Sequence, residues 1–147
     1  MTDETREGLL AALNELLEAE RAGARVTLET AHALSEPDLK ALVMDVHRDE
    51  AKWCAMLIGA IKRMDGEPSE TTGDFYGKVM AIEAMPARLA LLNRGQGWVA
   101  RRLRELAPTV SEPRLRADLD EMLVSHERNI GLVADRVPEA APPARKA

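Results

Sequence analysis

Apolar residues recur at alternating steps of three and four positions along most of the chain, and this spacing constrains the fold more than any other feature. The first seam consists of Leu13, Leu17, Glu20, Ala24, Thr27, Ala31 and Leu34. Residues three and four apart lie on one face of an α-helix, where they pack against neighbouring helices. Aromatic residues make up only 3% of the chain, which also disfavours sheets. The sequence therefore predicts an all-α protein.

Four long helices are predicted from such seams, over residues 5–34, 37–64, 86–107 and 113–137, with a short helical segment near 78–84. The second helix starts after Ser35, which we expect to cap it, with Pro37 in its first turn. Two connections are short, whereas the middle one is about as long as a bundle. This pattern predicts two antiparallel helical hairpins joined by a long crossover, in one domain over residues 1–137. The Pro- and Ala-rich segment 138–147 is expected to be a disordered tail.

An internal repeat supports the two hairpins. The tripeptide Ser35-Glu36-Pro37 recurs 76 positions later as Ser111-Glu112-Pro113. The same offset pairs polar residues that lie on otherwise apolar seams: Glu20 with Gln96, Glu50 with His126, and Trp53 with Asn129. A buried glutamate is costly unless it is paired, protonated or bound to a metal. We therefore expect these six residues to form one polar cluster in the core.

With this pattern, the chain resembles the ferritin-like superfamily, which includes the rubrerythrins, over residues 9–137. The segment from Glu50 through Leu57 to Asp65-Gly66-Glu67-Pro68 resembles the second helix and the following turn of rubrerythrin-like domains. The resemblance implies a ferritin-like four-helix bundle. It also implies a di-iron site in which the first and third helices each provide a Glu, and the second and fourth each provide Glu-x-x-His.

The residues at the implied ligand positions depart from the family's pattern. Glu20 and Glu50 retain the carboxylates of the first two helices, but Trp53 stands in place of a histidine. In the other hairpin, Gln96 and His126 stand where glutamates are expected and Asn129 replaces a histidine. An ordinary di-iron centre is therefore not expected, and neither is any other cofactor.

Two hypotheses for the polar residues stay open. In the first, Glu20 and Glu50 are held by hydrogen bonds to Gln96, Asn129 and His126, and Trp53 fills the space of the metal. In the second, Glu20, Glu50 and His126 bind a single Fe, Mn or Zn ion, with His47 as a weaker candidate ligand. Gly95 and Gly97, which flank Gln96, either open the helix for a ligand or allow close packing against Trp53.

The first hypothesis predicts a binding or interaction module, and the second a metal-dependent redox or stress-defence enzyme. No nucleophile–base pair or phosphate-binding loop is present in the sequence, so no catalytic residue is identified, and a binding role is favoured over an enzymatic one. Expected partners are a second copy of the chain, through Phe75 and Tyr76, or an unknown protein or small molecule. The net charge of −5 disfavours nucleic acid, and no apolar run reaches the length that a membrane requires. An acidic start and a single cysteine, Cys54, favour the cytoplasm.

Overall fold

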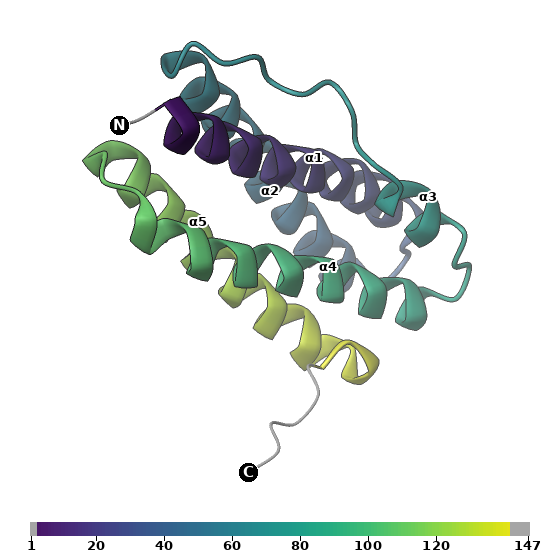
Figure 1. Cartoon of the computed structure of the whole chain (residues 1–147). Coiled ribbons are helices and arrows are strands. Elements are labelled where there is room, and N and C mark those ends of the chain that lie inside the picture. Colours follow the sequence, from purple (N-terminus) through teal and green to yellow (C-terminus); the bar gives the residue numbers. More distant parts are fainter. Residues whose placement is uncertain (1–2, 142–147) are drawn as a thin grey trace.

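The computed structural model describes residues 3–141, and this part of the chain contains helices and no strands (Figure 1). The α-helices are α1 (Asp3–Ala33), α2 (Pro37–Arg63), α3 (Phe75–Met80), α4 (Met85–Leu106) and α5 (Pro113–Arg136). Short 3-10 helices follow α4 at Ala107–Thr109 and α5 at Pro138–Ala140. The prediction of an all-α protein is confirmed. The short helix expected at 78–84 lies earlier, at Phe75–Met80. Pro86 lies in the first turn of α4, which begins at Met85, so the residues just before it form the connection between the two helices.

Both copies of the Ser-Glu-Pro repeat begin a helix in the same way. The Glu36 carboxylate accepts hydrogen bonds from the backbone N–H groups of Asp38 and Leu39, at 3.0 and 2.7 Å. The Glu112 carboxylate accepts equivalent bonds at the start of α5, also at 3.0 and 2.7 Å. The glutamate of the repeat is therefore the capping residue, and the expectation that Ser35 caps α2 was wrong. The longer side chain reaches two unpaired N–H groups at the positive end of the helix.

The four long helices enclose one core in a ring. α1 packs against α2 and α4, and α5 packs against the same two helices. α1 and α5 therefore face each other diagonally across the core, as do α2 and α4. In Figure 1 the connection after α2 runs back along α1 to α3. The Asn14 side chain holds it there by donating to the Glu67 carbonyl oxygen at 3.1 Å and accepting from the Ser69 N–H at 2.7 Å.

Two apolar clusters fill the core, one toward each end of the helices. The first includes Leu13, Leu17, Leu57, Leu103 and Leu119, and the second includes Val26, Val43, Leu89 and Val133. The polar seam residues predicted from the sequence lie in the middle of the helices, between these clusters.

The start of the segment that we expected to be disordered is folded. Pro138–Ala140 forms a 3-10 turn in which Ala140 is buried and its carbonyl oxygen accepts a hydrogen bond from the Asn93 side chain at 3.0 Å. The expectation was wrong for these residues because Asn93 on α4 gives the turn a partner. The rest of the predicted tail, residues 142–147, lies outside the described residues. Among the described helices, none has the length and apolar character needed to cross a membrane.

Candidate functional site

Glu20 on α1 and His126 on α5 form a buried pair across one diagonal of the core. His126 Nε2 lies 2.5 Å from Glu20 Oε1, and both side chains are at most 2% exposed. His126 Nδ1 lies 2.9 Å from the Met122 carbonyl oxygen, which can only accept, so Nδ1 carries a proton. Burial lowers the pKa of His126, but the Glu20 charge, the hydrogen bond to Glu20 and the Met122 carbonyl together raise it above its ordinary value. These contacts favour the protonated, positively charged form of the His126 ring beside Glu20.

Glu50 on α2 and Gln96 on α4 form the contact across the other diagonal. The Gln96 side-chain amide donates to Glu50 Oε1, and both residues are buried. Burial, and then the nearby charge of Glu20, raise the pKa of Glu50 well above the ordinary value, although the Gln96 hydrogen bond acts in the opposite direction. Glu50 is therefore a carboxyl group that favours its neutral form, because its polar partner has no charge to offset its own.

The two diagonal contacts are equivalent under the internal repeat. The offset of 76 positions relates Glu20 to Gln96 and His126 to Glu50, so the first contact maps onto the second. A two-fold relation between the hairpins predicts such an exchange of partners. The repeat thus extends from the helix caps to the polar contacts in the core, although the chemistry of the two contacts differs.

Trp53 and Asn129 form a separate set of contacts where α2 packs on α5. Trp53 Nε1 donates to Ser125 Oγ at 3.2 Å, and Asn129 Nδ2 donates to Asp49 Oδ2 at 3.0 Å. The offset relates these two bonds to each other as well, because Asp49 corresponds to Ser125. Asn129 therefore holds Asp49 rather than Glu20 or Glu50, contrary to the first sequence hypothesis. Sequence reasoning missed Asp49 because it lies beside the apolar seam, not on it.

His47 lies apart from the diagonal contacts. Its Nδ1 is 2.7 Å from the Ala24 carbonyl oxygen on α1, and the ring is half-buried. The proton on Nδ1 therefore goes to the α1 backbone. Among the described residues, no group of three or more His, Cys, Asp or Glu side chains is gathered as a metal ion would need.

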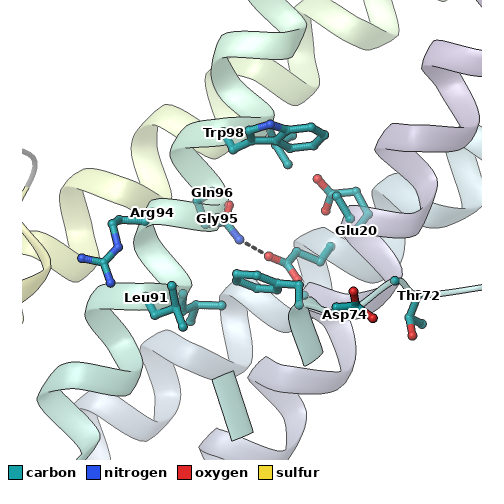
Figure 2. Close-up of a pocket in the computed structure, with 15 residues that line it drawn as sticks. Glu20, Thr72, Asp74, Leu91, Arg94, Gly95, Gln96 and Trp98 are labelled. Carbon is teal, nitrogen blue, oxygen red and sulfur yellow. Dashed lines mark hydrogen bonds between the residues drawn. The ribbon is translucent and has the colours of Figure 1, made fainter. Parts of the chain in front are cut away.

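A cavity of about 390 Å³ borders both diagonal contacts (Figure 2). It lies between α1 and α4, with Glu50 of α2 reaching it and the connection before α3 along one side. Its lining consists of Ala19, Glu20, Gly23, Glu50, Thr72, Gly73, Asp74, Phe75, Leu91, Leu92, Arg94, Gly95, Gln96, Trp98 and Val99. In Figure 2 the Glu20 carboxyl group points into the space between α1 and α4, whereas Arg94 points away from it.

Two glycines shape this cavity. A Cβ atom at Gly23 would lie 2.1 Å from Glu50 Oε2, so only glycine leaves room for the carboxyl group beside α1. A Cβ atom at Gly95 would lie 2.6 Å from the Phe75 ring, which packs directly on α4. Gly95 therefore accommodates Phe75, not Trp53 as one sequence expectation proposed. Phe75 is engaged by its own chain, and so is Tyr76, whose hydroxyl donates to Glu29 at 2.5 Å.

A family model described as "Domain of unknown function (DUF6306)" matches residues 7–135. No curated protein and no solved structure was found to match the chain. The matched range includes all four long helices except their outermost turns, both diagonal contacts and every residue that lines the cavity. The chain therefore belongs to this family of domains of unknown function, DUF6306.

Proposed function

We propose that this protein is a small-molecule binding module whose site is the cavity between α1 and α4. One observation carries the proposal: three side chains that line a largely apolar cavity carry buried polar atoms without hydrogen-bond partners in the described structure. These atoms are Glu20 Oε2, Glu50 Oε2 and Gln96 Oε1. Unpaired buried polar atoms cost about 1–3 kcal/mol each, and binding sites characteristically combine an apolar lining with a few convergent polar groups.

The architecture that we propose for this module is the ferritin-like four-helix bundle. Two hairpins with matching glutamate caps, a long crossover and an exchange of partners across the core support it. The residues at the implied di-iron positions do not fit such a centre. Trp53 and Asn129 use their N–H groups on Ser125 and Asp49, and Gln96 uses its amide on Glu50. Only two carboxyl groups and one imidazole remain as ligands, and the imidazole already contacts Glu20.

Binding can be tested with a neutral ring compound, benzyl alcohol, followed by the fluorescence of Trp98 in a Trp53→Phe background. Trp98 lines the cavity, whereas Trp53 lies where α2 packs on α5. We expect a saturable change in fluorescence that is weakened in Ala19→Phe, because Ala19 is on the cavity wall and the larger side chain occupies it. No saturable change in the parent, or the same change in the filled variant, would refute the cavity as the site.

The alternative function is that of a mononuclear metal protein, a redox or stress-defence enzyme that uses Glu20, Glu50 and His126. The unpaired Oε2 atoms of Glu20 and Glu50 favour this alternative, because a metal ion could bind both carboxyl groups. Elemental analysis after exposure to Fe(II), Mn(II) and Zn(II) separates the two. If the alternative is right, the parent protein should retain about one ion per chain, and Glu50→Gln should retain none. If the protein is a binding module, neither the parent nor the variant should retain an ion.

A homodimer and a cytoplasmic location remain parts of the proposal. Phe75 and Tyr76 contact their own chain, so α5 offers the better surface for a second copy. Val124 and Leu132 on this helix are 68% and 43% exposed. Sedimentation of Val124→Lys against the parent protein tests that surface, and an unchanged oligomeric state would exclude it.

A further inference from the structure

Resting on the proposed function, we further propose that the cavity binds a compact organic cation: a primary ammonium group on an apolar body. The ammonium lies against the Glu50 carboxyl group, and the body lies along the apolar wall between α1 and α4. The occupant follows from three properties of the cavity, namely the kind of hydrogen-bonding atoms, the balance of charge and the chemistry of the wall.

The unpaired polar atoms of the cavity are acceptors. Glu20 and Glu50 present carboxyl oxygens, and Gln96 presents its amide oxygen because its amide N–H is already used on Glu50. All three side chains are at most 6% exposed, so solvent at the surface does not satisfy them. All three atoms accept hydrogen bonds once Glu50 has lost its proton, so a ligand that complements the ionised site donates hydrogen bonds, and an ammonium group has three donors and no acceptor.

The balance of charge favours a cation over a neutral donor. The Glu20 carboxylate has its counter-charge in His126, whereas the partner of Glu50 is a neutral amide. Arg94 lines the cavity but points away from Glu20 in Figure 2, and Asp74 adds a further carboxyl group at the side of the connection. A ligand that brings one positive charge would give Glu50 the counter-ion that the protein lacks, and an anion would meet uncompensated carboxyl groups.

The wall of the cavity suits the apolar body of such a ligand. Leu91, Leu92 and Val99 line the α4 side, and the rings of Phe75 and Trp98 lie in the same lining. Aromatic faces attract a desolvated ammonium as well as apolar groups. The volume of about 390 Å³ is in the lower part of the range for small-molecule sites, which favours a ligand with a single ring or a short branched chain.

Binding of the cation should release a proton. Burial holds the pKa of Glu50 well above its ordinary value, which favours the neutral carboxyl group in the free protein. The ammonium stabilises the carboxylate form, and the proton leaves to solvent. The other ionisable groups around Glu50 are Glu20 on α1, Asp49 and Cys54 on α2 and His126 on α5, with Asp74 and Arg94 in the cavity lining. Affinity for the ammonium should consequently rise with pH until Glu50 is ionised.

The test uses three probes that share a benzyl or phenyl ring and differ in charge: benzylamine as the cation, benzyl alcohol as the neutral molecule and benzoate as the anion. Calorimetric titration of the full chain near neutral pH should give benzylamine an affinity about tenfold or more above benzyl alcohol, with no measurable binding of benzoate. For benzylamine, the heat should depend on the ionisation enthalpy of the buffer, which reports the released proton.

Variants identify the group that recognises the charge. Glu50→Gln keeps the shape of the side chain, and it should lower benzylamine affinity by about tenfold while benzyl alcohol affinity stays the same. Glu70→Gln, on the exposed connection, removes an equal charge from the surface and should change neither affinity. Equal affinities for the amine and the alcohol in the parent would overturn the ammonium inference and leave the binding module intact. Preferential binding of benzoate would do the same. Binding of none of the three probes would overturn the proposed function together with the inference.

Discussion

The two diagonal contacts of the core have the same place in their hairpins but different chemistry. Glu20 meets the imidazole of His126, which offsets its charge, whereas Glu50 meets the amide of Gln96, which does not. In the first contact the imidazole offsets the charge of the carboxylate, which reduces its cost of burial. In the second contact the neutral amide of Gln96 leaves the charge of a Glu50 carboxylate without an offset. Equivalent positions in the two hairpins therefore differ in whether a charged partner offsets the buried glutamate.

The largest effect should come from removing one member of the ion pair. His126→Leu leaves the Glu20 carboxylate buried without a counter-charge, and we expect the free energy of unfolding to fall by about 3–5 kcal/mol. Gln96→Leu removes the equivalent partner of Glu50, which can become neutral, so a smaller loss of about 1–2 kcal/mol is expected. Urea unfolding followed by circular dichroism measures both. Equal losses would mean that the two contacts do not differ in charge.

Replacing Glu20 or Glu50 by glutamine tests directly whether the two glutamates differ in charge. Glu50→Gln should leave the free energy of unfolding within about 1 kcal/mol of the parent, or raise it, because an amide in this place has no charge to bury. Glu20→Gln should lower it by about 1–3 kcal/mol, since His126 loses the carboxylate that holds its proton. The same unfolding experiment compares them. A greater loss in Glu50→Gln than in Glu20→Gln would contradict the assignment of the charged and neutral carboxyl groups.

The four long helices and the location of the polar residues in the core could be predicted from the sequence. Apolar spacing fixed which residues face inward, and Glu20, Glu50, Gln96 and His126 could be placed in mid-core because each interrupts an apolar seam. The spacing of seams does not say which polar residues touch. That depends on which helices are diagonal, and here the two-fold exchange within the repeat would have predicted both pairs.

Two features of the site and one helix cap could not be predicted from helical periodicity. Asp49 lies beside the seam, so its bond with Asn129 depends on the rotation of α2 against α5. The cavity depends on the path of the connection, whose Phe75 packs on Gly95 only once the hairpins have assembled. The capping role of Glu36 also escaped prediction, because Ser is the commoner cap and only the backbone geometry selects the neighbouring residue.

The two diagonal contacts should affect the stability of the protein over different ranges of pH. The pKa of Glu50 is raised from 4.5 and that of His126 from 6.5, so the folded state retains each proton after the unfolded chain has lost it. Each contribution is complete below the unfolded value and is lost as pH rises through the folded one. The lowered pKa values of Glu36 and Glu112 act in the opposite direction and at lower pH.

Glu50→Gln should therefore flatten the fall in stability that begins near pH 4.5 and leave the part that begins near 6.5. One proton corresponds to a slope of up to about 1.4 kcal/mol per pH unit. Urea unfolding at a series of pH values measures the slope. An unchanged profile in Glu50→Gln would show that folding does not raise the pKa of Glu50.

The alkylation rate of Cys54 should also reveal the difference in charge between Glu20 and Glu50, although the expected effect is smaller. Its thiol is half-buried, and burial, Glu20 and Glu50 together raise the pKa of the thiol to about 12, so alkylation by iodoacetamide should be slow. A charged carboxylate opposes formation of the thiolate more than a neutral acid does. We therefore expect Glu20→Gln to accelerate alkylation at mildly alkaline pH by a few-fold, and Glu50→Gln to accelerate it less.

Because Glu20→Gln also destabilises the fold, its rate needs a control that opens the chain equally without altering charge. Val43→Ala serves this purpose, since Val43 is fully buried in the second apolar cluster and far along α2 from Cys54. Its alkylation rate gives the part that comes from opening alone, and the excess in Glu20→Gln gives the electrostatic part. If Glu50→Gln shows the larger excess, Glu50 is the carboxyl group that carries the charge. The assignment of a charged Glu20 and a neutral Glu50 would then be reversed.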